Sequence, residues 1–508
     1  MILILNPPSR YSRNLVKDVA YGCWCKGKRI AGAQVPNLTM LNLATILRDI
    51  APTSYFDASL SDYDHSSFIK YLAKFDTIII PLSLASFPED KELINEVHQV
   101  NQNTVFIAYG PLATFSPRVV LKKSRINLCV LGEPEFTLRT LFRKIYEKRS
   151  GEIFRKKQGS KKKGYAIKPD IFQNDQIFSS ISSIAYKRYQ NKRDQDIIVQ
   201  PQKVPTHDLD EIPIADRTYI EDTYFFHPLV KNKKWTTMQT SRGCIGNCVF
   251  CSSPSFYKDS LRLQSLERIL EEIKELKSMG YQEIMFRDEN FCVSQQRVKK
   301  FCLQLITQSI NLDWMCNSRP DSLTKPLVQL MKRAGCHTIK FGVESGSQRM
   351  LNNYKKNILV SQIKKSFEWC HQAGIRTHAH LIIGGIGENK QTLKKTEEIL
   401  KEIKPTTITV NILMFLPGSP LFCTLEKSFP VSQLYNTITF KNMHETGQFL
   451  SFVNDLDPEY IEYYQKKLYR DYYLNLSYIL NQLKNIRGFF DIGRLLKSAI
   501  NVLDFAGF

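Results

Sequence analysis

The sequence lacks any uncharged apolar run that approaches the ~18 residues a helix needs to cross a bilayer. It also lacks the start of a secreted protein, because Met1–Ser9 has neither a basic leading segment nor a long apolar stretch. This segment instead predicts a buried strand, Ile2–Leu5, that ends at Pro7 and Pro8. We therefore expect a cytoplasmic protein without a membrane-spanning helix.

A regular cysteine framework is absent as well. The twelve cysteines are scattered along the chain, whereas the disulfide scaffold of a small secreted protein is dense and evenly spaced. The pattern favours a reducing compartment, which would also protect an oxygen-sensitive metal cluster.

Acidic residues are scarce relative to basic ones. The chain has 70 Lys and Arg against 49 Asp and Glu, a net charge of +21, and such a surface favours anionic partners. The excess is spread along the sequence, apart from the run Arg155–Lys163. Diffuse basicity promotes solubility more often than it binds nucleic acid, so a nucleic-acid partner is not favoured.

Length and composition predict several domains. A chain of 508 residues with 43% apolar residues exceeds what one core normally organises. We expect a first domain at 1–148, a basic linker and bridge at 149–228, a second domain at 229–428 and a helical C-terminal region at 429–508.

The first domain alternates apolar runs with helical stretches, which predicts a doubly wound, Rossmann-like (flavodoxin-like) parallel sheet. Its expected strands are Ile2–Leu5, Thr77–Pro81, Val105–Ala108 and Asn127–Leu131. Ligands of such sheets bind beyond the carboxyl ends of the strands. The segments there are Leu82–Phe87, which contains Ser83, Tyr109–Thr114 and Gly132–Glu135.

The segment between the domains contains a basic stretch and a hairpin. Ser150–Asp170 is basic and weakly apolar, which predicts a surface loop. Ser180–Tyr186 and Ile197–Val204 predict a small hairpin. Further upstream, Tyr21–Arg29 holds Cys23 and Cys25 in a loop that we expect to line a cleft.

The densest cysteine motif is Cys244-x-x-x-Cys248-x-x-Cys251, directly after the expected strand Thr236–Gln239. Three thiolates on so short a loop can bind three irons of a cubane cluster. Such clusters usually take a cysteine on every iron, so one iron would stay open for a small chelating molecule. A structural zinc site is the alternative, but it normally needs a fourth Cys or His nearby.

Strands and helices alternate again from Trp235 to about Cys423, which predicts an open, partial (β/α)6 barrel with its sites at the carboxyl ends of the strands. The further expected strands are Glu283–Phe286, Leu312–Asn317, Thr338–Gly342, Thr377–Ile383 and Thr407–Leu413.

His378 and His380 alternate on one expected strand and therefore face the same side. On the barrel interior they could contact a substrate or donate protons, whereas on the helix-facing side they would be hydrogen-bonded core residues. Buried, small apolar roles are expected for four cysteines of this region: Cys292, Cys316, Cys336 and Cys370.

Beyond the barrel, Pro458–Leu483 and Asp491–Phe505 have the spacing of amphipathic helices. Packing over the open barrel mouth is the expected arrangement, and binding at a membrane interface is the alternative.

The cysteine spacing, with Phe250 just before the third cysteine, resembles the radical S-adenosylmethionine (SAM) superfamily, and the resemblance extends along the whole barrel region. It implies a [4Fe–4S] cluster on Cys244, Cys248 and Cys251, with SAM on the open iron. Phe250 would then pack beside the adenine.

The same resemblance implies that residues at successive strand ends hold SAM. Asp288 and Glu289 would accept from the amino group, and Arg319 would pair with the carboxylate. The remaining SAM contacts would come from Glu344, Ser345, Gly384 and Gly385.

The first domain resembles the cobalamin-binding domain found ahead of many radical SAM enzymes. That family often has Gly-Gly-Pro-His-Ala-Thr after one strand and Gly-Glu-Gly-Glu after the next, where this chain has Tyr-Gly-Pro-Leu-Ala-Thr and Gly-Glu-Pro-Glu. Asp-x-His-x-x-Gly, the motif that binds cobalt through histidine, is absent, so we expect no histidine on the cobalt. The implied cobalamin contacts are Ser83, Gly110, Pro111, Gly132 and Glu133.

His207–Arg217 also resembles the bridge that joins the two domains in this family, with Ala215 in place of its second proline. Together these features imply a cobalamin-dependent radical SAM enzyme, which cleaves SAM to a 5′-deoxyadenosyl radical and methylates an unactivated carbon. Oxidative cyclisation or another rearrangement is an alternative outcome. A tRNA methylthiotransferase is a second alternative, but it should carry another N-terminal cysteine triad and a C-terminal β-barrel. A non-catalytic cobalamin or redox sensor would not need the SAM-binding residues.

The expected partners follow from this chemistry. They are a small-molecule or lipid substrate and an electron donor such as flavodoxin or ferredoxin, with peripheral membrane contact through the C-terminal helices as a further expectation.

Overall fold

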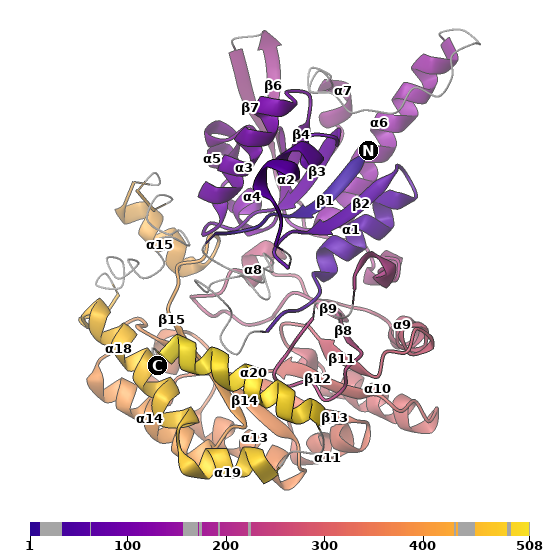
Figure 1. The fold of residues 1–508 in the computed structure, drawn as a ribbon. Coiled ribbons are helices and arrows are strands. Elements are labelled where there is room, and N and C mark those ends of the chain that lie inside the picture. The colour runs from indigo at the N-terminus through magenta and orange to yellow at the C-terminus, as the bar shows by residue number, and fades with distance from the viewer. Residues whose placement is uncertain are drawn as a thin grey trace.

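The computed structural model describes residues 1–10, 33–60, 62–155, 171, 175–191, 194–221, 225–430, 433–434, 453–484 and 489–506. The loop with Cys23 and Cys25 and most of the basic run Arg155–Lys163 lie outside these residues. Two mainly parallel sheets organise the chain, and Figure 1 shows the first above the second.

The first sheet has the strand order β2-β1-β3-β4-β5-β6-β7, in which β1 to β5 are parallel and the β6–β7 hairpin is antiparallel. Four of its strands are buried along their whole length, as expected where helices cover both faces of a parallel sheet. This arrangement confirms the doubly wound prediction. The strands are β1 Ile2–Asn6, β2 Thr53–Asp57, β3 Thr77–Pro81, β4 Val105–Tyr109, β5 Leu128–Val130, β6 Ile184–Asn191 and β7 Asp194–Gln200.

Alternate side chains of these strands enter two separate cores. Ile4, Ile79 and Ile107 pack on one face with α1 and α6, whereas Leu3 and Ile78 pack on the other with α2 and α3. The helices of the domain are α1 Leu38–Arg48, α2 His65–Leu72, α3 Phe87–Val100, α4 Pro111–Phe115, α5 Pro117–Lys123, α6 Pro134–Arg155 and α7 Asp175–Phe178.

Two features of this sheet differ from the sequence prediction. Strand β2 was not predicted, because Thr53–Asp57 lies at the sheet edge, is only half-buried and lacks an apolar run. The hairpin that the sequence assigns to the linker instead pairs with β5, so the first sheet continues beyond residue 148 to Gln200.

The second sheet is a six-stranded parallel sheet with the order β15-β14-β13-β12-β11-β8. Its first and last strands are both edges, which confirms an open partial barrel. The strands are β8 Trp235–Met238, β11 Glu283–Phe286, β12 Asp313–Ser318, β13 Cys336–Glu344, β14 Arg376–Ile383 and β15 Thr407–Ile412. The helices between them are α9 Leu266–Ser278, α10 Gln295–Thr307, α11 Lys325–Arg333, α12 Gln348–Asn353, α13 Val360–Gln372 and α14 Lys390–Ile403.

The bridge at Ala215–Arg217 binds both domains. Ala215 is buried against Leu38 and Leu41 of α1. Asp216 pairs with Arg48 at the end of that helix, while Arg217 donates to Glu272 of α9 at 3.0 Å and to the Thr237 carbonyl at 2.9 Å. Successive residues thus hold the two domains in one arrangement.

The C-terminal helices lie against the β15 edge of the barrel and against the segment that precedes β8. Helix α18, Pro458–Tyr473, lies along β15, and α19, Leu476–Lys484, leads into α20, Phe489–Ala506. Arg494 of α20 donates to the carbonyl oxygen of Pro228, in the segment before β8. The expected packing over the barrel mouth is therefore wrong, because the first domain occupies that side (Figure 1).

Tyrosine hydroxyls bind backbone groups of the edge strand β15, which a neighbouring strand would otherwise pair. The Tyr473 hydroxyl lies 2.9 Å from both the nitrogen and the oxygen of Ile408. The Tyr469 hydroxyl lies 2.8 Å from the nitrogen of Val410, whose oxygen accepts from Gln465 at 2.7 Å. Unpaired backbone N–H and C=O groups on an edge strand can pair with another chain and cause aggregation. The side chains of Tyr469, Tyr473 and Gln465 bind these groups on β15 and so prevent such pairing.

We predict that Tyr469→Phe and Tyr473→Phe each lower the free energy of unfolding by about 1–3 kcal/mol, because each leaves buried backbone groups unpaired. Urea titration would measure the loss. Tyr463→Phe is the matched control, since Tyr463 is on the same helix but 54% exposed. Equal stability of Tyr473→Phe and the control would contradict this role.

Candidate active site

Strand β8 leads into a two-residue strand, β9 Ser241–Arg242, and then into the loop with the three cysteines. Gly243 has φ +95°, and a Cβ there would lie 1.8 Å from the carbonyl oxygen of Ser260. Only glycine can make this turn. A Cβ on Gly246 would lie 3.4 Å from Sγ of Cys244 and 3.9 Å from Sγ of Cys248, so these two sulfurs flank Gly246.

The three thiols lie on one short loop and fit a cubane cluster, whose thiolate ligands bind different irons. Among the residues that the structure describes, no three His, Cys, Asp or Glu side chains are already placed to hold one metal ion. Burial raises the pKa of Cys248 and raises that of Cys251 to about 12, so deprotonation would accompany metal binding.

The other barrel cysteines are elsewhere in the fold. Cys292, Cys316, Cys336 and Cys370 are at most 1% exposed, on the side of the strands that packs against helices. They are the buried small residues that the sequence predicts.

Asp288 supports the approach to the cysteine loop. Its carboxylate is fully buried, accepts from the backbone nitrogen of Thr240 at 3.0 Å and also accepts from the Ser241 hydroxyl. Burial raises the pKa of this carboxyl above its usual range. Neighbouring Glu289 accepts from the Ser253 hydroxyl at 3.4 Å, two residues beyond Cys251.

Arg319 lies against the cysteine loop. Its Nη1 is 3.4 Å from where a Cβ of Gly246 would stand. Its Nε and Nη2 bind Asp321 at 3.0 and 2.9 Å, and Nη2 also donates to the carbonyl oxygen of Lys356 at 2.8 Å. The guanidinium fork is thus already oriented by Asp321, with Nη1 toward the loop.

Glu344 and Ser345 separate in the structure. Glu344, at the end of β13, pairs with Lys356 at 2.6 Å, and Gly342 leaves the room for this pair. Ser345 is fully buried, with its hydroxyl 3.0 Å from that of Thr396 in α14. Glu344 therefore lies beside the strand-end space, while Ser345 joins the turn to α14.

Phe250 lies near the glycine turn after β14. Its ring stands edge-on to Tyr354, with centroids 5.4 Å apart. A Cβ on Gly385 would lie 1.8 Å from the Tyr354 hydroxyl, so this close approach requires glycine. Glu388 accepts from the backbone nitrogen of Gly385 at 3.1 Å and thereby fixes the Gly384–Gly385 turn.

The two histidines of β14 face the barrel interior, because Ala379, Leu381 and Ile383 occupy the helix-facing side. His378 is hydrogen-bonded to Thr407 and Thr409, at 2.7 and 3.0 Å. His380 is half-buried, and its ring centroid lies 4.4 Å from that of His378. Burial, with the charges of Lys340 and Lys356, lowers the pKa of His380 to about 3.

At the carboxyl edge of the first sheet, two glycines turn the chain. Gly110 has φ +98° and Gly132 has φ +83°, and the Gly132 nitrogen donates to the Thr114 hydroxyl at 2.9 Å. Pro111 begins α4 directly after the first turn. Ser83 is buried after β3, with its hydroxyl 3.0 Å from that of Ser86.

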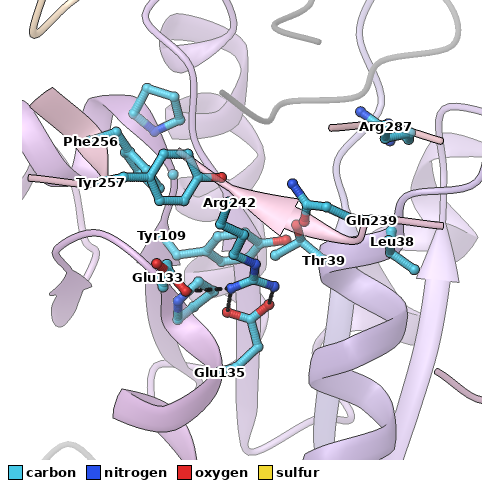
Figure 2. Close-up of a pocket in the computed structure, with 13 residues that line it drawn as sticks. Leu38, Thr39, Tyr109, Glu133, Glu135, Gln239, Arg242, Phe256, Tyr257 and Arg287 are labelled. Carbon is cyan, nitrogen blue, oxygen red and sulfur yellow. Dashed lines mark hydrogen bonds and ion pairs between the residues drawn. The ribbon is translucent and has the colours of Figure 1, made fainter. Parts of the chain in front are cut away.

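A pocket between the domains joins this edge to the barrel (Figure 2). Arg242, two residues before the first cysteine, lies at its centre and binds Glu133 and Glu135. Burial opposes the charge of Arg242, but the two carboxylates raise its pKa well above the ordinary value. The lining residues are Leu38, Thr39, Tyr109, Gly110, Pro111, Glu133, Pro134, Glu135, Gln239, Arg242, Phe256, Tyr257 and Arg287.

Among the residues that the structure describes, no histidine lines this pocket. His65 is exposed and pairs with Glu96. His98 lies near the carboxyl end of α3 and packs against Phe106, toward the opposite edge of the sheet. The residues at the pocket therefore fit a large ligand held by backbone turns rather than by an imidazole.

Sequence reasoning placed the cysteines, Phe250 and the strand ends together, but it gave no role to Arg242, Glu135, Lys356 or Glu388. For Arg242 and Glu135, the one signal available in the sequence was their opposite charge, since each follows the end of a strand and the two strand ends face each other. The SAM-binding and cobalamin-binding roles of individual residues remain predictions.

Residues 238–400 match the family model described as the Radical SAM superfamily, from the end of β8 into α14. Over 492 residues the chain is 25% identical to an uncharacterized methyltransferase of Pyrococcus horikoshii, covering 94% of this chain and 95% of that protein.

Two solved structures have a similar fold. The radical SAM methyltransferase TsrM from Kitasatospora setae, with cobalamin and a [4Fe–4S] cluster bound, aligns with a TM-score of 0.60 and 15% identity, over 84% of this chain and 74% of that one. The cobalamin-dependent SAM radical enzyme OxsB, with aqua-cobalamin and SAM bound, aligns with a TM-score of 0.60 and 16% identity, over 99% of this chain and 71% of that one.

We predict that Glu388→Gln stabilises the protein at neutral and higher pH. Burial raises the pKa of Glu388 to about 7, so the folded state holds a proton that the unfolded chain releases above about pH 4.5. This carboxyl therefore lowers stability as pH rises through that interval, by up to about 3 kcal/mol at ~1.4 kcal/mol per unit.

Urea titrations at pH 5 and pH 8 would test it: the variant should gain on the wild type only at pH 8. Glu398→Gln, an exposed position on helix α14, which begins two residues after Glu388, should keep the pH dependence of the wild type. An equal difference between wild type and Glu388→Gln at both pH values would refute the prediction.

Proposed function

We propose that this chain, a radical SAM enzyme, uses cobalamin to methylate an unactivated carbon of a small-molecule substrate. The observation that carries the proposal is the shared pocket, which is lined by Gly110 and Glu133 of the first sheet and by Arg242, two residues before Cys244. The likeness of the whole fold to TsrM and OxsB and the similarity to a methyltransferase over 94% of the chain support it.

The residues present fit the three cofactors. Cys244, Cys248 and Cys251 would hold a [4Fe–4S] cluster, because they share the short loop after β9 and the sulfurs of Cys244 and Cys248 both flank Gly246. SAM would lie against Phe250, Glu289, Glu344 and the Gly384–Gly385 turn, with Arg319 facing its carboxylate. Ser345 and Asp288 would not contact SAM directly, since their polar groups bind Thr396 and Thr240; they would hold the SAM-binding residues in place.

Cobalamin would lie at the carboxyl edge of the first sheet, against Ser83, the Gly110–Pro111 turn and the Gly132–Glu133 turn. When bound, the cofactors would supply two things: an electron that cleaves SAM to a 5′-deoxyadenosyl radical, and a methyl group. The chain's own residues orient the reactants and exclude water. The electron itself requires a reduced donor protein such as flavodoxin or ferredoxin, and the charge of +21 suits an acidic one.

We predict that Cys244→Ala, Cys248→Ala and Cys251→Ala each abolish the broad iron–sulfur absorbance and all cleavage of SAM to 5′-deoxyadenosine. Cys292→Ala and Cys370→Ala are matched controls and should keep the cluster, because both thiols are buried on the helix-facing side of the barrel. Absorbance spectra and iron analysis of anaerobically reconstituted protein measure this. Loss of the cluster in a folded control variant would show that the ligands are misassigned.

We predict that the protein binds cobalamin without a protein histidine on the cobalt, because Leu112 stands where relatives often have histidine and no histidine of the described part of the chain lines the pocket. The electron-spin spectrum of bound cob(II)alamin should lack splitting from a protein nitrogen. His65→Ala and His98→Ala should leave it unchanged. Nitrogen splitting that disappears in either variant would overturn this assignment, and failure to bind cobalamin would overturn the methyltransferase function.

The C-terminal helices give the chain an apolar face suited to an anionic membrane surface. Seven of the fifteen exposed large apolar side chains in the described residues fall between Leu474 and Ile500. Ile492, Leu496 and Ile500 repeat every fourth residue on α20, and the exposed residues described on this helix include Lys497 but no carboxylate. No described helix combines the length and apolar character needed to cross a bilayer, so contact would be peripheral.

We predict that the protein sediments with phosphatidylglycerol-containing vesicles and that the double variant Leu496→Glu/Ile500→Glu loses most of this binding. Leu303→Glu is the control, since Leu303 is an isolated exposed apolar residue on α10. A wild-type protein that stays in the supernatant, or a double variant that sediments like the wild type, would contradict membrane contact.

A further inference from the structure

We infer that Arg242 is a positioning residue that sets the spacing between the cobalamin site and the cluster site, acting through Glu135 and Glu133. The inference rests on the proposed function, since it presumes that both cofactors bind. Arg242 touches neither the reacting carbon nor the cysteine sulfurs in this account. It fixes where the cysteine loop stands relative to the first sheet.

Arg242 is rigidly connected to the cluster ligands. It precedes Gly243 and Cys244 directly, and its strand β9 pairs with β10, Arg262–Leu263. The preceding Ser241 is held by the buried carboxylate of Asp288. Gly243 is blocked on its other side by the carbonyl oxygen of Ser260. A displacement of Arg242 therefore also displaces Cys244, because the short segment between them is not flexible.

The other end of the contact is equally rigid. Glu135 is 0% exposed and lies three residues after Gly132, at the start of α6. Arg242 binds it through Nη1 at 3.1 Å and through Nη2 at 2.5 Å. The same Nη1 lies 2.6 Å from Glu133, within the turn that would contact cobalamin. One guanidinium thus joins the cysteine loop to the Gly132–Glu133 turn.

The chemistry of this contact depends on arginine and on the paired charges. Arg262 binds the second oxygen of Glu133. The four ionised side chains, Arg242, Arg262, Glu133 and Glu135, are therefore two cations and two anions with no unpaired charge. A lysine in place of Arg242 retains the charge but cannot bind both oxygens of Glu135 while reaching Glu133. The loss is therefore one of geometry, not of net charge.

Other contacts also hold the domains together. A Cβ on Gly418, in the turn after β15, would lie 2.2 Å from the Phe115 ring of α4. Gln202 donates to the carbonyl oxygen of Phe256 at 2.7 Å, and Asp216 pairs with Arg48. Weakening the Arg242 contact should therefore shift the loop within an otherwise intact domain arrangement. Displacement of reacting groups by ~1 Å can slow a reaction by ~10²-fold.

The test uses full-length protein loaded with both cofactors and compares Arg242→Lys and Glu135→Gln with the wild type. The measured quantity is the magnetic coupling between the reduced cluster and cob(II)alamin, which reports the distance between the two sites. Both variants should bind cluster and cobalamin, and the coupling should weaken or its distribution should broaden. Arg48→Lys, which alters a contact between the domains away from the cysteine loop, should match the wild type.

Coupling identical to the wild type in Arg242→Lys and Glu135→Gln, with both cofactors bound, would overturn the inference. If Arg242→Lys does not assemble the cluster, Glu135→Gln decides, because it leaves β9 and the cysteine loop unchanged. A wild-type protein that binds the cluster but no cobalamin would instead refute the proposed function, so the two failures are distinguishable.

Discussion

The arrangement of the molecule depends on the buried ion cluster between its two sheets. Both parallel sheets present their carboxyl ends to the same space, and these ends carry the turns and loops that bind ligands. Arg242 from the barrel and Glu135 from the first sheet meet there with almost no exposure to solvent. Removing one partner of such a pair leaves a buried, uncompensated charge at a cost of about 3–5 kcal/mol, so the domains have one favourable arrangement.

The barrel is open at one side, and the first domain covers its mouth. These two facts bear on the contacts at the β15 edge and on the protonation state of the interior histidine His380. The edge of β15 needs hydrogen-bond partners, and the tyrosines of α18 provide them. Inside the barrel, His378 is buried and His380 is half-buried. His380 is consequently neutral, because burial and the neighbouring lysines lower its pKa. A neutral imidazole can donate one hydrogen bond and accept another, but with so low a pKa it is a poor proton acceptor and has no acidic proton to donate.

The sequence predicted the elements whose signal is local, and it missed those that depend on distant partners. All six barrel strands were found because buried β/α units have regular apolar runs, and the three cysteines were found because they share one short loop. Strand β2 and the sheet membership of the β6–β7 hairpin were missed, since pairing at an edge leaves little trace in composition. The Arg242–Glu135 contact joins residues 107 positions apart, and no periodicity records such a contact. Asp288 was recognised as a strand-end acceptor, but only the fold shows that Thr240 and Ser241 use its oxygens.

The most direct test of the account is anomalous X-ray scattering from crystals of protein purified and loaded without oxygen, recorded at the iron and cobalt absorption edges. We predict iron beside Cys244, Cys248 and Cys251, and cobalt between the Gly110 and Gly132 turns and the barrel mouth, with no histidine nitrogen bound to it. Cobalt at another place, cobalt ligated by a histidine, or iron away from these three cysteines would contradict it.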